Sequence, residues 1–219
     1  MKLSEAVRGV SGTLAADGEF SCIAFATEQE QSQFLTFLEK EKFLPALDNS
    51  KISCVLTTSA LAEKIPPHIK GVFLCDRPKA ALFEIHNRLA RHPDYVGASA
   101  ATVVGEGCSI SPLAAIDCEN VVIGDRVTIE PFVVIKGRVI IGNDVTIRSG
   151  AVIGCKGFSF SKDAQGQNVS VEDTARIIIE DHVEIFEQVA ISTGIFPWEE
   201  TRIGENTKVD AQCHIGHGA

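Results

Sequence analysis

The stretch Val121-Val-Ile-Gly-Asp-Arg-Val-Thr-Ile-Glu-Pro-Phe-Val-Val-Ile135 repeats its aliphatic residues every six positions, and this spacing continues to Ile153. The repeated isoleucines are Ile123, Ile129, Ile135, Ile141, Ile147 and Ile153, and a second small or branched apolar residue stands two positions before each. A helix would place apolar residues three and four apart, and a simple amphipathic strand would alternate without a longer period. A fixed six-residue period is typical of a repeat protein. We predict a parallel β-helix.

The same period extends to both sides of this stretch. It includes Val104, Ile110 and Ile116 before it, and it resumes from Ile179 to Ile215 after a break. Sixteen repeat positions, at three per coil, predict about five coils. The break predicts a loop inserted at about 154–178. Glycine follows many of the aliphatic residues, as at Gly124 and Gly142, and we expect it to permit the tight corners.

Residues 1–97 lack this period and predict a small α/β domain. Strands are expected near 20–25, 52–56 and 71–75, an amphipathic segment at 28–38 and a helix at 78–91. No GxGxxG follows any of these strands, so a dinucleotide-binding fold is not indicated. The β-helix is then expected to occupy residues 98–219.

Composition narrows the function classes. Hydrophobic residues make up 45% of the 219 residues and charged residues 22%, as in a globular protein. The net charge of −9 argues against nucleic-acid binding, which needs clustered Lys and Arg. The seven cysteines form neither a CxxC nor a zinc spacing, so we expect reduced thiols and no metal site. No apolar run predicts a signal peptide or a transmembrane helix, and we expect a cytoplasmic protein.

The pattern Ile-Gly-x-x-x-x resembles that of the hexapeptide-repeat acyltransferases. This resemblance implies a left-handed β-helix, because the six-residue spacing alone does not give the handedness. A small α/β domain, a hexapeptide helix and an inserted loop, in that order, are most similar to the UDP-3-O-(3-hydroxyacyl)glucosamine N-acyltransferases of lipid A biosynthesis. The fold expected is therefore mainly β, with a nucleotide-sugar-binding-like α/β domain in front of a left-handed parallel β-helix.

The segment Asp210-Ala-Gln-Cys-His-Ile-Gly-His217 resembles the family's D-x-x-x-Q-I-A-H segment. The resemblance implies that His217 is the catalytic base and Asp210 its acidic partner, while His214 stands at the usual Gln position as a substrate-binding residue. A base that titrates near neutrality suits an amine that loses a proton as it attacks a thioester. The alternative is that His217 is a surface histidine on a corner.

The segment Gly157-Phe-Ser-Phe160 opens the inserted loop and resembles the family's GFxF loop. The resemblance implies that Gly157, Phe158 and Phe160 line an acyl or pantetheine channel beside a neighbouring subunit. Two aromatic rings would give a thioester donor an apolar cover. The alternative is that both rings only attach the loop to the β-helix.

Phe37, Lys40 and Phe43 match the family pattern F-x-x-N-x-x-Y, which contacts the uracil of the nucleotide sugar. The two rings suit stacking on a base. Lys40 replaces an amide and offers hydrogen-bond donors only, so uridine specificity does not follow from the pattern. The alternative is that both phenylalanines belong to the core.

The resemblance implies an acyltransferase that moves an acyl group from acyl carrier protein to the amine of a nucleotide-linked amino sugar, with no bound cofactor. An acetyl-CoA-dependent sugar acetyltransferase and a non-catalytic scaffold or paralogue remain alternatives. A homotrimer is expected, with sites between subunits.

Ser192-Thr-Gly194 stands where Asp-Arg-Gly is usual, so one charged substrate contact is expected to be missing. The sequence ends two residues after His217. Either a further coil that supplies the oxyanion-binding N–H lies outside it, or that part of the site has been lost.

Overall fold

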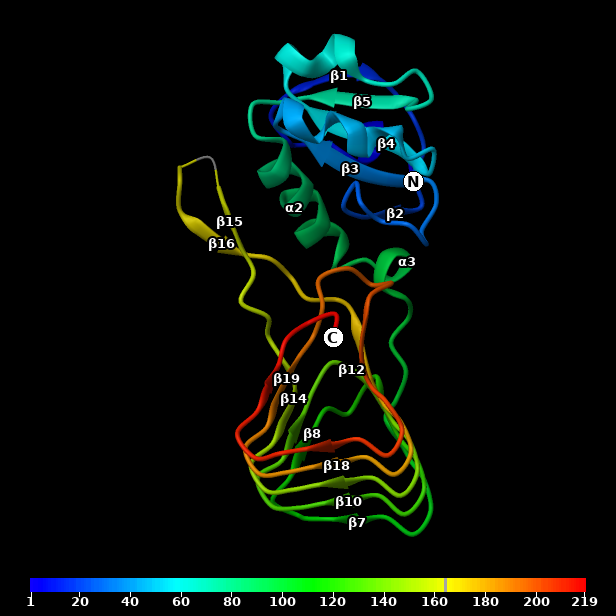
Figure 1. The fold of residues 1–219 in the computed structure, drawn as a ribbon, viewed down its shortest axis with the longest axis vertical. Helices are drawn as coiled ribbons and strands as arrows, with labels where there is room; N and C mark the ends of the chain where they lie inside the picture. Colours follow the sequence, from blue (N-terminus) through cyan, green and yellow to red (C-terminus); the bar gives the residue numbers. More distant parts are fainter. Residues whose placement is uncertain (164) are drawn as a thin grey trace. The chain divides into compact units, whose positions relative to one another are not determined.

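A computed structural model describes residues 1–163 and 165–219, which form two compact units. The N-terminal unit consists of Met1–Tyr95 together with Ser159–Glu172, and the β-helix unit consists of Val96–Phe158 together with Asp173–Ala219 (Figure 1). None of the helices in the described residues is long and apolar enough to cross a membrane.

The N-terminal unit is built on one five-stranded sheet in the order β1-β5-β4-β3-β2. Its strands are β1 (Thr13–Ala16), β2 (Cys22–Ile23), β3 (Phe34–Leu38), β4 (Ile52–Thr57) and β5 (Gly71–Leu74). Its helices are α1 (Leu3–Ala6), the 3-10 helices η1 (Glu41–Asp48) and η2 (Ser59–Lys64), and α2 (Pro78–Leu89). All neighbouring strands are parallel except β1 and β5.

Strand β3 corrects the expectation of an amphipathic segment at 28–38. Phe34, Leu35, Thr36 and Leu38 are all buried, because β3 lies between two neighbouring strands and is covered on both faces. Such a strand is a continuous apolar run rather than an alternating pattern. The amphipathic periodicity therefore pointed to the wrong element.

Helix α2 forms where it was predicted and ends two residues earlier. Pro78 stands in its first turn, where the missing N–H costs nothing. Ala81, Leu82, Ile85 and Leu89 are buried, and the helix contacts β3 and β4. This apolar stripe packs α2 on one face of the sheet.

The predicted insert contains a β-hairpin, β15 (Phe160–Lys162) and β16 (Asn168–Ser170). Residues 159–172 group with the N-terminal unit, although the sequence assigned them to the β-helix. The reason is a set of hydrogen bonds to α2. The Asn87 side chain donates to the Ser170 carbonyl oxygen at 2.9 Å and accepts from the Glu172 N–H at 2.9 Å. His86 Nε2 lies 2.8 Å from the Glu172 carbonyl oxygen.

The β-helix unit has three five-stranded sheets, which we call sheets D, E and F. Each coil adds one strand to every sheet. Sheet D holds β6 (Val103–Val104), β9 (Val121–Ile123), β12 (Arg138–Ile141), β17 (Arg176–Ile179) and β20 (Glu200–Ile203). Sheet E holds β7 (Ser109–Ile110), β10 (Thr128–Ile129), β13 (Thr146–Ile147), β18 (Glu184–Ile185) and β21 (Lys208–Val209). Sheet F holds β8 (Ala115–Ile116), β11 (Val134–Ile135), β14 (Val152–Cys155), β19 (Ala190–Ser192) and β22 (His214–Ile215). The short helix α3 (Pro93–Val96) spans the boundary between the two units.

The repeated aliphatic residues form the core of this unit. Every pair from Val121 and Ile123 to Ala151 and Ile153 is at most 1% exposed. Parallel pairing between coils brings equivalent residues together, as in Ile123 with Ile141 and Ile141 with Ile179. The predicted fold class, a left-handed parallel β-helix preceded by a small α/β domain, is confirmed.

The role expected for the corner glycines is corrected. Left-handed backbone at the corners is adopted by non-glycine residues, including Arg126 (φ 55°), Asp144 (φ 55°) and His182 (φ 59°). Gly124 is required for a different reason, because a Cβ there would lie 2.6 Å from the Gly142 carbonyl oxygen of the next coil. Close stacking of coils, rather than conformational freedom, therefore selects glycine at this position.

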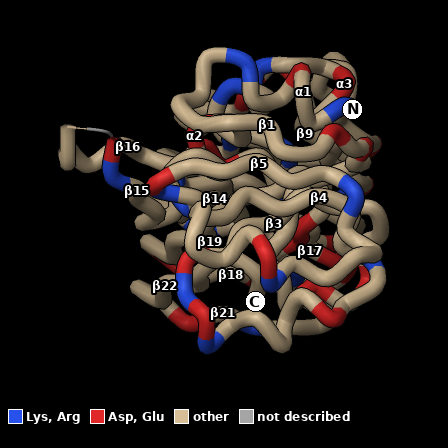
Figure 2. Tube along the Cα trace, turned by 90° about the horizontal axis from the view of Figure 1, so that it is seen from above, with Lys and Arg blue, Asp and Glu red and all other residues tan. Residues whose placement is uncertain are grey.

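Charged residues of both signs lie side by side along the coils, as near β21 in Figure 2. Arg148 Nη1 lies 3.3 Å from Glu130 Oε1, and its other terminal nitrogen contacts Glu184. Arg202 bridges Glu180 at 2.6 Å and Glu200 at 2.7 Å. The pairs of Arg148 and the Arg202–Glu180 pair connect successive coils, whereas Arg202 and Glu200 both lie in β20. Each partly exposed pair contributes little to stability because water screens it.

Candidate functional site

The last coil carries the three residues predicted at the C-terminal end. Asp210 follows β21 of sheet E, His214 lies in β22 of sheet F, and His217 follows β22 at the next corner. All three residues are exposed. Both imidazoles are therefore exposed on this coil in the described structure.

Asp210 and His217 occupy two different corners of this coil. Asp210 Oδ1 accepts the N–H of Ala211 at 2.8 Å, as a residue that caps its own turn does. Within the described part of the chain, no hydrogen bond joins the Asp210 carboxylate to the His217 ring. The predicted acid–base pair is therefore not formed inside a single chain in this structure.

His214 has a direct partner that the sequence did not identify. Its Nε2 lies 2.9 Å from the hydroxyl oxygen of Ser192, which is only 3% exposed. Ser192 Oγ also lies 3.3 Å from Cys155 Sγ. The family pattern marks Ser192 only as the position of a missing charge. The available signal was its position directly after the repeat residue Ile191.

The Gly157-Phe-Ser-Phe160 segment is divided between the two units. In the β-helix unit, the buried Gly157 donates its N–H to Asp173 Oδ2 at 2.7 Å, which joins the two ends of the insert. Phe158, also in that unit, is 94% exposed. Phe160 begins β15 in the N-terminal unit and is 49% exposed. Each ring is thus exposed within its own unit.

Of the predicted base-binding residues, Phe37 lies in β3, Lys40 directly precedes η1 and Phe43 lies in η1. The Phe37 ring is partly buried and packs edge-on against Phe25, with 6.4 Å between the ring centroids. Lys40 is exposed, and its carbonyl oxygen accepts the Phe43 N–H at 3.0 Å, which opens η1. Phe43 is 53% exposed, with Lys42 Nζ 4.8 Å from its ring centroid. Phe43 is thus not a core residue, and its ring is accessible for stacking.

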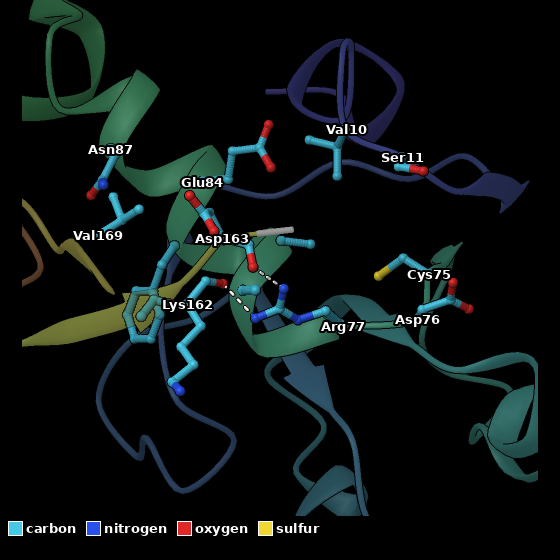
Figure 3. A pocket seen from close by; sticks show the side chains of 14 residues that line it. Val10, Ser11, Cys75, Asp76, Arg77, Glu84, Asn87, Lys162, Asp163 and Val169 are labelled. Atoms are coloured by element: carbon cyan, nitrogen blue, oxygen red, sulfur yellow. Dashed lines mark hydrogen bonds between the residues drawn. The ribbon is translucent and has the colours of Figure 1, made fainter. Parts of the chain in front are cut away.

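A pocket of about 450 Å³ lies within the N-terminal unit, between the first turns of α2 and the β15–β16 hairpin (Figure 3). The Arg77 guanidinium donates to the Lys162 carbonyl oxygen at 2.7 Å and to that of Asp163, and so holds the hairpin over the pocket. None of the residues predicted as site residues lines it. The pocket is a feature that the sequence patterns did not indicate.

Cys75 lines this pocket as a protonated thiol. Burial raises the pKa of the Cys75 thiol to about 11, although the N–H of Arg77 lowers it in part. The neutral thiol is a poor nucleophile at physiological pH. Across residues 1–163 and 165–219, no group of three or more His, Cys, Asp or Glu residues is placed to hold a metal ion.

Comparisons with known proteins agree with this architecture. The family model for the bacterial transferase hexapeptide (six repeats) matches residues 120–155. The UDP-3-O-acylglucosamine N-acyltransferase of Helicobacter hepaticus is 31% identical over 232 aligned positions, which cover 95% of this chain and 67% of that protein. The proteins of the same name from Coxiella burnetii and Helicobacter pylori are 28% and 26% identical, and each alignment covers 69% of the relative. A β-helix core, an inserted loop and a match over 95% of this chain lead to one assignment: the chain belongs to the UDP-3-O-acylglucosamine N-acyltransferase family.

Proposed function

We propose that this N-acyltransferase moves an acyl group from the thioester of acyl carrier protein to the amine of a UDP-linked 3-O-acylglucosamine, as a step of lipid A biosynthesis. The observation that carries the proposal is the exposed His217 at the corner after β22, in a segment that resembles the family's catalytic segment. The names of the relatives support the amino-sugar acceptor and the N-acyl product.

His217 acts as general base in this proposal. The amine nitrogen attacks the thioester carbonyl carbon while the neutral imidazole takes the proton that the amine releases. The resulting tetrahedral species collapses, and its C–S bond breaks. The leaving thiolate then takes the proton from the imidazolium, which yields an amide and a free thiol and restores the neutral base. An imidazole can take up a proton and return it near neutrality, so one group serves both steps.

Asp210 is assigned the stabilisation of the His217 imidazolium in the assembled enzyme. Inside one chain the two residues lie at different corners, so this role requires a second copy of the chain or a rearrangement of the terminal coil. The proposal takes the first of these routes and includes a homotrimer, as the family resemblance implies.

An apolar stripe on the outer face of sheet D supports this assembly. Val103, Val122, Ile140 and Ile178 pair in register across four successive coils. Val103 is 57% exposed, Val122 44% and Ile140 39%. An exposed apolar row that crosses several strands is typical of an interface, and a second copy of a straight β-helix offers a matching flat face.

Phe43, Phe37 and Lys40 are proposed to bind the nucleotide. The exposed Phe43 ring suits stacking on the uracil, and the Lys40 ammonium suits hydrogen bonds to its carbonyl oxygens. Phe158 and Phe160 are proposed to cover the acyl or pantetheine group, because both rings are accessible.

The test is a transfer assay with UDP-3-O-acylglucosamine as acceptor and three donors: acyl–acyl carrier protein, acyl-CoA and acetyl-CoA. The amide product is detected by mass spectrometry. Faster transfer from acyl–acyl carrier protein is the expected result. A preference for acetyl-CoA would favour the sugar acetyltransferase, and the absence of transfer from every donor would favour the scaffold.

A further inference from the structure

Three polar side chains from consecutive coils form a row on sheet F. Cys155 comes from β14, Ser192 from β19 and His214 from β22. Cys155 Sγ lies 3.3 Å from Ser192 Oγ, and Ser192 Oγ lies 2.9 Å from His214 Nε2. Ser192, in the centre of the row, is only 3% exposed, so water competes little for its hydrogen bonds. The row connects the half-buried Cys155, at the start of the insert, to an exposed imidazole.

A backbone irregularity builds this row. The pairing of β14 with β19 shifts between Ile153 and Cys155, so that Cys155 stands opposite Ser192. The residue between them is Gly154, with φ 86° in the left-handed region. Such a bulge redirects the side chain that follows it. The thiol is therefore aimed at the Ser192 hydroxyl by the fold itself.

Ser192 is also linked, through Thr201, to Gly218, the residue that follows His217 in the chain. Its carbonyl oxygen accepts a hydrogen bond from Thr201 Oγ1 at 3.0 Å. The same Thr201 oxygen, which is completely buried, accepts the Gly218 N–H at 3.1 Å. Ser192 thus contacts a side chain three residues before His217 and, through Thr201, the backbone one residue after it.

We propose that Ser192 is a positioning residue for acyl transfer, which fixes the His214 ring and the corner that carries His217. The inference rests on the proposed function, in which His217 is the base. The thiol donates to Ser192 Oγ, the Ser192 hydroxyl donates to His214 Nε2, and the remaining ring proton is on Nδ1. His214 then presents an N–H donor to an acceptor oxygen of the substrate, in place of the donor and acceptor of an amide.

The first experiment is independent of activity. Nitrogen-15 NMR of the histidine rings is recorded for the wild type, Ser192→Ala and the control Ser149→Ala, with His214→Gln to assign the His214 signals. Ser149 donates to Glu130 Oε2 at 3.0 Å and is not connected to the row. We expect the Nδ1–H tautomer of His214 in the wild type and in Ser149→Ala, and a shift towards Nε2–H in Ser192→Ala. An unchanged tautomer in Ser192→Ala would overturn the proposal.

The second experiment measures the rate of acyl transfer. Loss of a hydrogen bond that orients a reacting segment is expected to lower kcat of Ser192→Ala about tenfold, with Ser149→Ala at the wild-type value. Equal kcat and KM in the two variants would contradict the positioning role. If the wild type transfers no acyl group, the proposed function fails, and the NMR result alone decides whether the row fixes His214.

Discussion

Gly154 lies against the carbonyl oxygen of Lys136, so closely that a Cβ atom at residue 154 would overlap with that oxygen. Lys136 follows β11, the strand that pairs with β14 on the opposite side from β19. The bulge that places Cys155 opposite Ser192 is therefore possible only with glycine at this position.

Gly154→Ala is expected to destabilise the β-helix far more than Gly137→Ala. Both residues have left-handed backbone, with φ 86° and 84°, but a Cβ at Gly137 would meet nothing within 4 Å. Backbone strain alone costs about 1–2 kcal/mol, and the overlap at residue 154 adds about 1–3 kcal/mol. Urea denaturation of the two variants measures the difference. Equal free energies of unfolding would show that the contact with Lys136 is not restrictive.

Asn87→Ala is expected to loosen the β15–β16 hairpin. The variant removes both hydrogen bonds between the Asn87 side chain and the hairpin. Each bond contributes about 1 kcal/mol, so amide hydrogen exchange in residues 159–172 should become about 10–30 times faster. Lys79→Ala is the control, because Lys79 is exposed on the same helix. Unchanged exchange in Asn87→Ala would mean that other contacts hold the hairpin.

The N-terminal unit is expected to lose stability in mild acid. Burial lowers the pKa of His86, against the opposing effect of the Glu172 carbonyl, so the folded ring stays neutral where the unfolded ring gains a proton. The contribution of His86 is complete above the unfolded value of about 6.5 and is lost as the pH falls through the lower folded value. Thermal unfolding from pH 7.5 to pH 5 measures this loss.

His86→Gln should reduce the pH dependence of unfolding, while the control His92→Gln, at an exposed position, should retain it. If both variants kept the full dependence, another group would have to account for it.

Ile140→Lys is expected to dissociate the proposed trimer. The substitution places a charge in the centre of the apolar stripe on sheet D, where its desolvation in an interface is unfavourable. Light scattering at micromolar concentration should give a threefold lower mass than the wild type. Leu14→Lys, at an exposed position of β1, is the control and should leave the mass unchanged. A monomeric wild type would contradict the assembly.

The β-helix was predictable because one six-residue spacing along the chain places the aliphatic residues of its core. Residues such as Ile123 and Ile141 are equivalent in every coil, so a six-residue period reports burial directly. The strand β3 was missed because Phe34 to Leu38 is buried on both faces, which removes the alternation that identifies a strand. The corner glycines were found, but at Gly124 and Gly142 their role is determined by the stacking of coils, which the local sequence does not report.

The candidate site was only partly predictable. Sequence similarity predicts roles for His214 and His217, since both stand in one short segment. The contact between Ser192 and His214 joins residues 22 positions apart, and it depends on the number of residues in the intervening corner. The attachment of the hairpin to α2 joins Asn87 to Ser170, 83 positions away, so no local pattern reports it.

The most direct test of the function is kcat for acyl transfer by His217→Ala in the assay with acyl–acyl carrier protein. His182→Ala is the matched control, because His182 is also an exposed corner histidine but lies one coil earlier. Removal of a general base is expected to lower kcat about 100-fold to 10,000-fold, with the control at the wild-type rate. Wild-type kcat in His217→Ala would contradict the assignment of His217 as the base.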